Sequence, residues 1–258
     1  MLPNFHSNGL KAFLDEKAAQ YNHPRFIDTD PIQIPHRYTL KEDMEIAAFL
    51  TATIAWGNRK SIIANARKMM QLMGDSPYDF IMSHNPEQLK PLRNFVHRTF
   101  NGDDLIYFIK SLKNICEKHR GMEAAFLLHA EEEHLQNGIS AFKKLFFELP
   151  HPERTTKHIS DPAKGSPAKR INMFLRWMVR NDKAGVDLGI WRRISPAQLS
   201  CPLDTHTGNI ARKLGLLQRR QNDAKALAEL DKRLRQFDAE DPVKYDYALF
   251  GLGAFEKF

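Results

Sequence analysis

The sequence predicts an all-α fold, and two observations carry this prediction. Apolar residues recur at a spacing of three to four over most of the 258 residues, which is the period of an amphipathic helix. Strand-like alternation is confined to residues 26–27 and 32–34, and both segments lie beside prolines. We therefore expect helices over residues 42–73, interrupted by a turn near Gly57, and over residues 103–118, 123–128, 139–148 and 168–180.

The least regular part of the chain is residues 149–167, which contain four prolines and a glycine. Such a stretch is typical of a boundary between two helical portions. We expect one lobe to comprise residues 42–160, and a second lobe to combine residues 1–41 with residues 161–258. The fold class predicted is a two-lobed helical bundle with a cleft between the lobes, and we expect a monomer.

Composition excludes several classes of protein. Mean hydropathy is −0.49 and no apolar run approaches twenty residues, so no membrane span is expected. The N-terminal residues do not have the charged-then-apolar layout of a signal peptide. Two cysteines, Cys116 and Cys201, are too few for a four-thiolate zinc site or an iron–sulfur cluster. We expect a cytoplasmic protein without metal or other cofactor.

The positive charge of the chain is concentrated in one segment. The net charge is +7, and residues 151–220 hold fourteen lysines and arginines against five acidic residues. A local excess of this size is compatible with a polyanionic partner, and equally with an ordinary solvated face. Within the helix expected at residues 168–180, Lys169, Asn172, Arg176 and Arg180 form one narrow stripe. A cationic stripe on an otherwise apolar helix requires water or an anion beside it.

The most specific motif begins with Cys201-Pro202-Leu203-Asp204-Thr205-His206-Thr207-Gly208 and continues from Asn209 to Leu216. Locally it predicts a helix start, with Asp204 as the N-cap and Gly215 closing the helix. The whole string also resembles the Asp-Thr-His signature of the helix-hairpin-helix base-excision DNA glycosylases, the superfamily of endonuclease III and 8-oxoguanine glycosylase. The resemblance implies that Asp204 is the catalytic carboxylate. Asn209 departs from the pattern, because many members carry arginine there.

The same superfamily has a Gly-x-Gly-x-Lys hairpin before a helix, and Gly165-Ser166-Pro167-Ala168-Lys169 resembles it. The resemblance implies a helix-hairpin-helix element and makes Lys169 the nucleophile of a bifunctional member. Pro167 replaces the second glycine and removes a backbone N–H, which normally serves a DNA phosphate. The chain as a whole also resembles an uncharacterised bacterial family related to these glycosylases, through RINMFLRWMVR, DLGIW, PLDTHTG and DPVKYDYALFGLG.

These resemblances imply a DNA repair glycosylase that acts on a damaged base in double-stranded DNA, an oxidised purine being our expectation. A carboxylate stabilises the positive charge that develops on the sugar, and a neutral lysine forms a Schiff base that permits abasic-site lyase activity. DNA contacts are expected from residues near these motifs and from the turn at Gly57: Gly165, Ser166, Arg170, Arg176, Arg212, Asn58 and Arg59. The expected base pocket or wedge residues are Trp56, His206 and Phe250.

Three alternatives remain open. Asp204 is also explained as a plain N-cap, and Lys169 as a solvated or phosphate-contacting lysine. The chain is also explained as a helical DNA-binding protein that lacks the chemistry. From another class, a hydrolase of small phosphoesters could use Asp204 and His206 together with the arginines.

Overall fold

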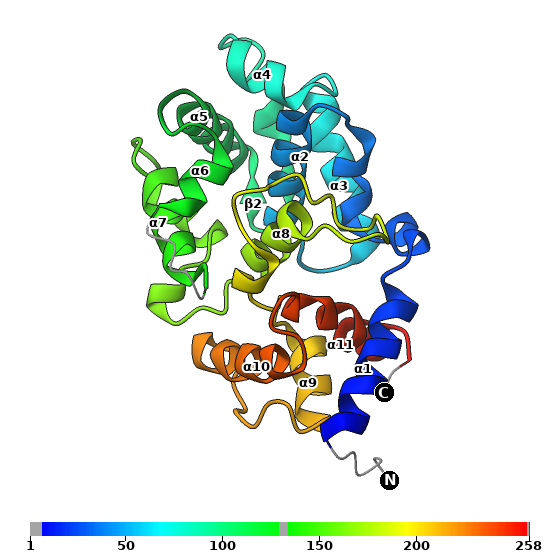
Figure 1. Ribbon diagram of the computed structural model, residues 1–258. Coiled ribbons are helices and arrows are strands. Elements are labelled where there is room, and N and C mark those ends of the chain that lie inside the picture. Colours follow the sequence, from blue (N-terminus) through cyan, green and yellow to red (C-terminus); the bar gives the residue numbers. More distant parts are fainter. Residues whose placement is uncertain (1–6, 129–133, 257) are drawn as a thin grey trace. The chain divides into compact units, whose positions relative to one another are not determined.

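The computed structural model describes residues 7–128, 134–256 and 258. It is mostly helical, as predicted, with one pair of two-residue strands among the described residues (Figure 1). None of the described helices is both long and apolar enough to span a membrane. The chain forms two compact units. Unit 1 takes in the described parts of Met1–Phe26, Glu131–Asn137 and Ser160–Phe258, and unit 2 those of Ile27–Ala130 and Gly138–Ile159.

Unit 2 is built from six α-helices, four 3-10 helices and the strand pair within its described residues. The α-helices are α2 (Lys41–Thr53), α3 (Arg59–Leu72), α4 (Pro77–Ser83), α5 (Gly102–Lys118), α6 (Met122–Leu127) and most of α7 (Gln136–Phe146). The strands are β1 (Val96–His97) and β2 (Phe100–Asn101). The 3-10 helices are η2 (Pro31–Gln33), η3 (Pro35–Arg37), η4 (Pro91–Asn94) and η5 (Glu153–His158).

Local sequence explains where these helices begin. The interruption expected near Gly57 separates α2 from α3, and Gly57 has a φ of +103°, which an L-residue rarely adopts. Asn58 then caps α3 by accepting the Ser61 N–H at 3.2 Å. Helix α5 starts with a capping box, in which Asn101 and Asp104 each accept the other's backbone N–H. Such reciprocal bonds satisfy two of the N–H groups that a helix start leaves without partners.

The core of unit 2 is aromatic. Phe49 of the buried helix α2 lies within 6.0 Å, ring centre to ring centre, of Phe108, Phe142 and Phe146. All four rings are fully buried, and Phe49 is stacked with Phe108, edge-on to Phe142 and tilted against Phe146, in place of the face-to-face sandwich that aromatic pairs avoid. The apolar residues whose spacing predicted α2, α5 and α7 therefore include the residues that form this core.

The strand-like segments of the sequence are not strands. Residues 26–27 lie in the 3-10 helix η1 (Pro24–Thr29), and residues 32–34 lie in and directly after η2. Pro24 and Pro31 start these 3-10 helices, because the fixed φ of proline suits the first position of a helical turn. The strands instead pair antiparallel around Arg98 and Thr99, with Val96 opposite Asn101.

Unit 1 contains α1 (Ser7–Tyr21), α8 (Lys169–Val179), α9 (Thr205–Lys213), α10 (Ala224–Phe237) and α11 (Tyr245–Ala254). It also contains the 3-10 helices η6 (Pro162–Lys164), η7 (Pro196–Gln198) and η8 (Pro242–Lys244). Helix α11 packs against both α1 and α9 (Figure 1). At Gly251 a Cβ would lie 2.1 Å from the Tyr21 ring, so only glycine permits the close approach of α1 and α11. An apolar cluster that includes Leu14, Ile210, Leu230 and Leu249 forms the core.

The division into units differs from the expected boundaries at two places. Residues 27–41 belong to unit 2 and not to the C-terminal part, because the buried Ile32 and Ile34 lie in segments that pack against α2 and α3. Residues 134–137 belong to unit 1, where Gln136 Nε2 donates to Asn172 Oδ1 at 3.2 Å. Neither assignment has a local signal, since both depend on contacts far along the chain.

Candidate active site

Asp204 stands at the start of α9 and uses its two carboxylate oxygens differently. Oδ1 accepts the Thr207 N–H at 3.0 Å, so Asp204 is the N-cap that its position predicted. Oδ2 lies 3.8 Å from Nζ of Lys169. The capping role and the proposed catalytic role are therefore compatible, because each uses a different oxygen.

Lys169 is the first residue of α8, and its Nζ lies 3.8 Å from the Met173 sulfur as well as 3.8 Å from Asp204. The side chains of Lys169 and Asp204 are 28% and 24% exposed. They are 35 residues apart in the sequence, and the fold of unit 1 brings the starts of two helices together. An amine and a carboxylate this close can both reach one reacting atom that lies beside the pair.

The segment of residues 165–168, between η6 and α8, is closed by its own hydrogen bonds. Gly165 has a φ of +84° and donates its N–H to Pro162 O at 2.9 Å, while the Ser166 N–H faces Asp161 O at 3.3 Å. The Ala168 N–H donates to Ser166 Oγ at 3.1 Å, and Pro167 has no N–H. Every backbone donor of residues 165–168 is thus engaged or missing. The backbone N–H groups of Gly165 and Ser166 are thus used within the protein, and the prediction that these two residues contact DNA stays a prediction.

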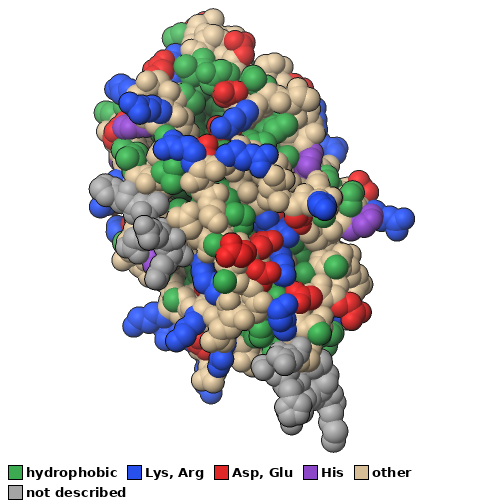
Figure 2. Space-filling view, viewed as in Figure 1, with side chains coloured by type: hydrophobic (Ala, Val, Ile, Leu, Met, Phe, Trp, Pro, Cys, Tyr) green, Lys and Arg blue, Asp and Glu red, His purple; other side chains and the backbone are tan. Residues whose placement is uncertain are grey.

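The basic stripe of α8 is largely neutralised inside unit 1. Arg176 is 4% exposed, and its guanidinium pairs with Asp187 at 3.1 Å and with Asp246. Arg180 pairs with Asp187 at 3.2 Å and with Asp241 at 2.9 Å. Figure 2 likewise shows acidic side chains flanked by basic ones on the drawn face. The stripe was predicted to need water or an anion, and its buried arginines are paired with carboxylates of the same unit.

Arg176 is therefore not a DNA contact, which corrects the prediction for this residue. Its guanidinium also lies 4.3 Å from the centre of the Tyr247 ring, a cation–π contact. Arg170 differs, because it is half-buried and burial lowers the pKa of its guanidinium to about 10. It remains a cation at neutral pH, and its role in binding DNA stays a prediction.

Asp246 is a site residue that the sequence reasoning missed. It is 4% exposed, and burial raises its pKa to about 6, opposed by the nearby Arg176. The charges of Asp204 and Lys169 also act on its pKa, so it lies in the neighbourhood of this pair. The thiol of Cys201 donates to its Oδ1 at 3.8 Å. The available signal was an acidic residue within the otherwise apolar run at residues 245–255.

The sequence reasoning also missed Asn222, whose side chain holds the backbone of Asp204 in place. Its Nδ2 donates to the backbone oxygen of Asp204 at 2.9 Å, and its Oδ1 accepts from Arg212 at 2.6 Å. Arg212 Nε donates to Arg219 O at 2.8 Å, so this guanidinium ties the following loop to α9. The prediction that Arg212 contacts DNA stays a prediction. At Gly208 a Cβ would lie 2.6 Å from Asn222 Oδ1, which explains the glycine in the motif.

His206 and Phe250 are brought close together beside the start of α9. Their ring centres are 6.5 Å apart in an edge-on arrangement. His206 is exposed and Phe250 is half-buried, so the pair presents an aromatic edge near Asp204. Phe250 also contacts Phe26 edge-on at 6.2 Å. Their service as a base pocket stays a prediction.

Trp56, Asn58 and Arg59 belong to unit 2, whereas Lys169 and Asp204 belong to unit 1. Trp56 is half-buried, and its ring packs edge-on against His97 at 5.1 Å and stacks on His158 at 6.2 Å. The exposed tip of the turn is therefore Gly57-Asn58 and not the tryptophan.

No curated protein and no solved structure matches the chain. One family model, described as "Protein of unknown function (DUF2400)", matches residues 30–255. The matched range includes the Lys169–Asp204 pair and every residue named above as holding it in place. The match spans most of unit 2 and of unit 1, and the chain belongs to this family of unknown function, DUF2400.

Proposed function

We propose that this chain is a DNA glycosylase of the helix-hairpin-helix superfamily with abasic-site lyase activity, acting on damaged double-stranded DNA. One observation carries the proposal. Nζ of Lys169 lies 3.8 Å from Oδ2 of Asp204, and these are the two positions at which the sequence resembles the nucleophile and the carboxylate of that superfamily. We take an oxidised purine as the base, by analogy with the 8-oxoguanine branch.

The chemistry assigns one role to each side chain. When the C1′–N bond to the base breaks, its electron pair leaves with the base, which takes up a proton from water. The positive charge left on the sugar is stabilised by the Asp204 carboxylate. The deprotonated amine of Lys169 donates its lone pair to C1′, and opening of the sugar ring gives a Schiff base. Loss of a proton from C2′ then expels the 3′ phosphate, which is the lyase step.

The geometry around the pair supports these roles. The Thr207 N–H and the Asn222 amide fix the carboxyl group and the backbone of Asp204, so the carboxylate needs little rearrangement to stabilise charge. Both side chains are about three-quarters covered. Partial cover of this kind strengthens the interaction of a carboxylate with a developing positive charge, because less water screens it.

Borohydride trapping tests the proposal. The wild-type protein should cross-link covalently to a duplex that contains an abasic site or 8-oxoguanine. Lys169→Gln should abolish the cross-link, whereas Lys164→Gln, an exposed lysine five residues earlier, should cross-link like the wild type. Duplex binding without cross-linking or base release would favour the non-catalytic DNA-binding alternative. Absence of duplex binding at low salt would overturn every nucleic-acid interpretation.

The small-phosphoester alternative receives less support from the described residues. A phosphoryl group is usually held by arginine guanidinium groups. Arg176 is engaged by Asp187 and Asp246, and Arg212 is engaged by Asn222 and Arg219. Arg176 and Arg212 are thus committed to internal partners. We therefore retain the glycosylase as the proposed function.

A further inference from the structure

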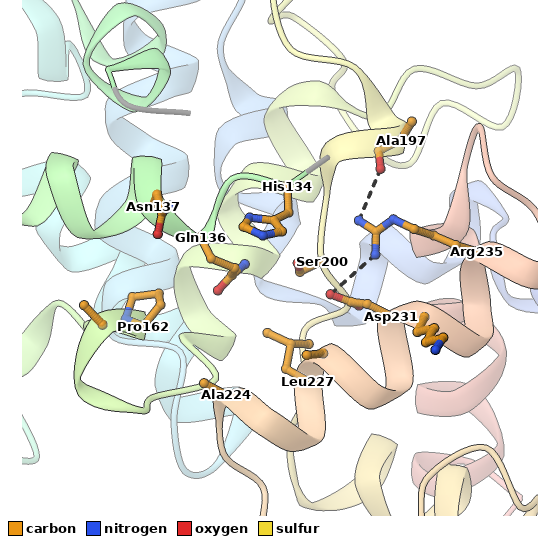
Figure 3. A pocket seen from close by; sticks show the side chains of 13 residues that line it. His134, Gln136, Asn137, Pro162, Ala197, Ser200, Ala224, Leu227, Asp231 and Arg235 are labelled. Carbon is orange, nitrogen blue, oxygen red and sulfur yellow. Dashed lines mark hydrogen bonds and ion pairs between the residues drawn. The ribbon is translucent and has the colours of Figure 1, made fainter. Parts of the chain in front are cut away.

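Unit 1 contains a second candidate site, a pocket with a volume of about 620 Å³. One face of α10 forms its wall, since the lining residues of that helix are spaced by three or four positions. Residues 134, 136 and 137, the 3-10 helices η6 and η7, and Ser200 complete the lining (Figure 3). The walls are mostly apolar, with Leu227, Pro162 and several alanines. A pocket of this size and lining is typical of a small-molecule site.

Hydrogen-bond acceptors gather in this pocket. The side chain of Asp231 is 10% exposed, and its Oδ1 accepts the Cys201 N–H at 2.9 Å. Gln136 donates its Nε2 to Asn172, and its Oε1 has no hydrogen-bond partner among the described residues. A buried acceptor without a partner costs free energy unless a ligand or water supplies a donor. The pocket therefore suits a ligand that presents N–H groups to a carboxylate and an amide oxygen.

Two cationic side chains of α10, Arg235 and Lys232, line the pocket in different surroundings. Arg235 donates to Ala197 O at 3.2 Å and to Leu199 O at 2.8 Å, and its nearest approach to the Asp231 carboxylate is 3.7 Å. Lys232 is exposed on the next turn of α10. The Asp231 carboxylate is thus paired on one side with Arg235, and Lys232 provides a positive charge at the rim.

We infer that this pocket binds a purine nucleotide of the guanine type, with the base inside and the phosphate at the rim. The adjacent ring N–H and amino group of guanine match two acceptors, Asp231 and Gln136. The apolar walls cover the faces of the ring, and Lys232 contacts the phosphate. At the same edge adenine presents a ring nitrogen that accepts hydrogen bonds. A carboxylate also only accepts hydrogen bonds, so it repels this nitrogen. The inference goes beyond the proposed glycosylase and does not depend on it.

The site would also act on the segment that carries Asp204. Asp231 holds the backbone N–H of Cys201, three residues before Asp204. A ligand that bonds to Asp231 therefore touches the same side chain that anchors the approach to α9. Nucleotide binding can therefore be measured directly. Its influence on the Lys169–Asp204 pair can be measured separately.

Protonation of Asp231 should control the affinity. Burial raises the pKa of its carboxyl group to about 6. Arg235 and Lys232 on α10 and His134 on the neighbouring segment are the other charged or titratable groups that line the pocket. A carboxylate accepts two N–H groups, whereas its protonated form loses part of that capacity. Affinity should therefore fall as the pH is lowered through about 6.

Titration calorimetry of the full chain with GMP, AMP and inorganic phosphate tests the inference. GMP should bind saturably at pH 7.5, and at least about tenfold more tightly than AMP, because a mismatched charged hydrogen bond costs that much. Asp231→Asn should weaken GMP binding by about tenfold or more and abolish its pH dependence, while still accepting the Cys201 N–H. Ala228→Trp, which fills the mouth without altering a polar group, should abolish binding.

Lys232→Ala should weaken GMP more than guanosine, and Lys225→Ala, an exposed lysine of the same helix outside the pocket lining, should leave both unchanged. Absence of saturable GMP binding would overturn the inference. Equal affinity for GMP and AMP, or full competition by phosphate alone, would also overturn it. If the affinity for GMP still depends on pH in the Asp231→Asn variant, the titrating group is His134, and the role given to Asp231 is rejected. None of these outcomes bears on borohydride trapping, so the two proposals fail separately.

Discussion

Asn222 donates its amide N–H to the backbone oxygen of Asp204 at 2.9 Å, and Arg212 orients that amide by donating to its oxygen at 2.6 Å. This relationship joins residues 18 positions apart and places a fixed dipole behind the proposed catalytic carboxylate. Since Asn222 does not itself face Lys169 in any described contact, we regard it as a positioning residue.

Asn222→Ala should therefore slow the proposed reaction through the orientation of Asp204. We expect single-turnover trapping on abasic DNA to fall by about tenfold, with little change in duplex affinity. The matched control is Asn209→Ala, an exposed asparagine on α9, which should behave like the wild type. A loss of duplex affinity equal to the loss of rate would contradict a positioning role.

The two roles of Asp204 can be separated by two substitutions. Asparagine also caps helices well, whereas alanine does not, so Asp204→Ala should lower the free energy of unfolding by about 1 kcal/mol and Asp204→Asn by much less. Both should reduce base release by about a hundredfold or more, because neither supplies a negative charge. Urea denaturation and a base-release assay measure the two effects. Normal base release by Asp204→Asn would leave Asp204 with the capping role only.

Asp246 should make the stability of unit 1 depend on pH. Its folded-state pKa is raised from 3.8 to about 6 by burial, so between these values the folded state holds a proton that the unfolded state has lost. The stabilising contribution of this group is complete below pH 3.8 and is lost as the pH rises through about 6. Asp246→Asn removes that titration. The stability of the variant relative to the wild type should therefore rise by up to about 1.4 kcal/mol per pH unit in this window.

Urea denaturation of both proteins at several pH values checks this expectation. Asp231 also has its pKa raised to about 6 by burial, and it contributes equally to both proteins, so it cancels in the difference. A stability difference that stays constant between pH 3.8 and about 6 would show that Asp246 does not titrate there.

Removal of Arg176 should destabilise the protein strongly. Its guanidinium pairs with Asp187 and Asp246 within a buried part of unit 1, and Arg176→Met would leave both carboxylates with one cationic partner fewer. Breaking a buried pair from one side costs about 3–5 kcal/mol. Arg220→Met, at an exposed arginine, should cost less than about 0.5 kcal/mol. Equal stability of the two variants in denaturant would contradict the structural role of Arg176.

Much of the helical architecture was readable from the sequence because its causes are local. The break near Gly57 and the apolar spacing of α2, α5 and α8 involve residues within a few positions of one another. The N-cap at Asp204 is equally local. The segments at residues 26–27 and 32–34 were ambiguous, since prolines favour both extended chain and 3-10 turns.

By itself the sequence determined the helical class, the start of α9 at Asp204 and the two positions, Lys169 and Asp204, at which it resembles a glycosylase. Only the tertiary structure decided that these side chains lie 3.8 Å apart, that Asn222 supports one of them, and that Arg176 and Arg212 are engaged internally. It also decided that the backbone N–H groups of residues 165, 166 and 168 are bonded within the segment before α8. The physical reason is range: capping and periodicity act within one or two helical turns, whereas the partner of a buried charge is chosen by packing between segments far apart in the chain.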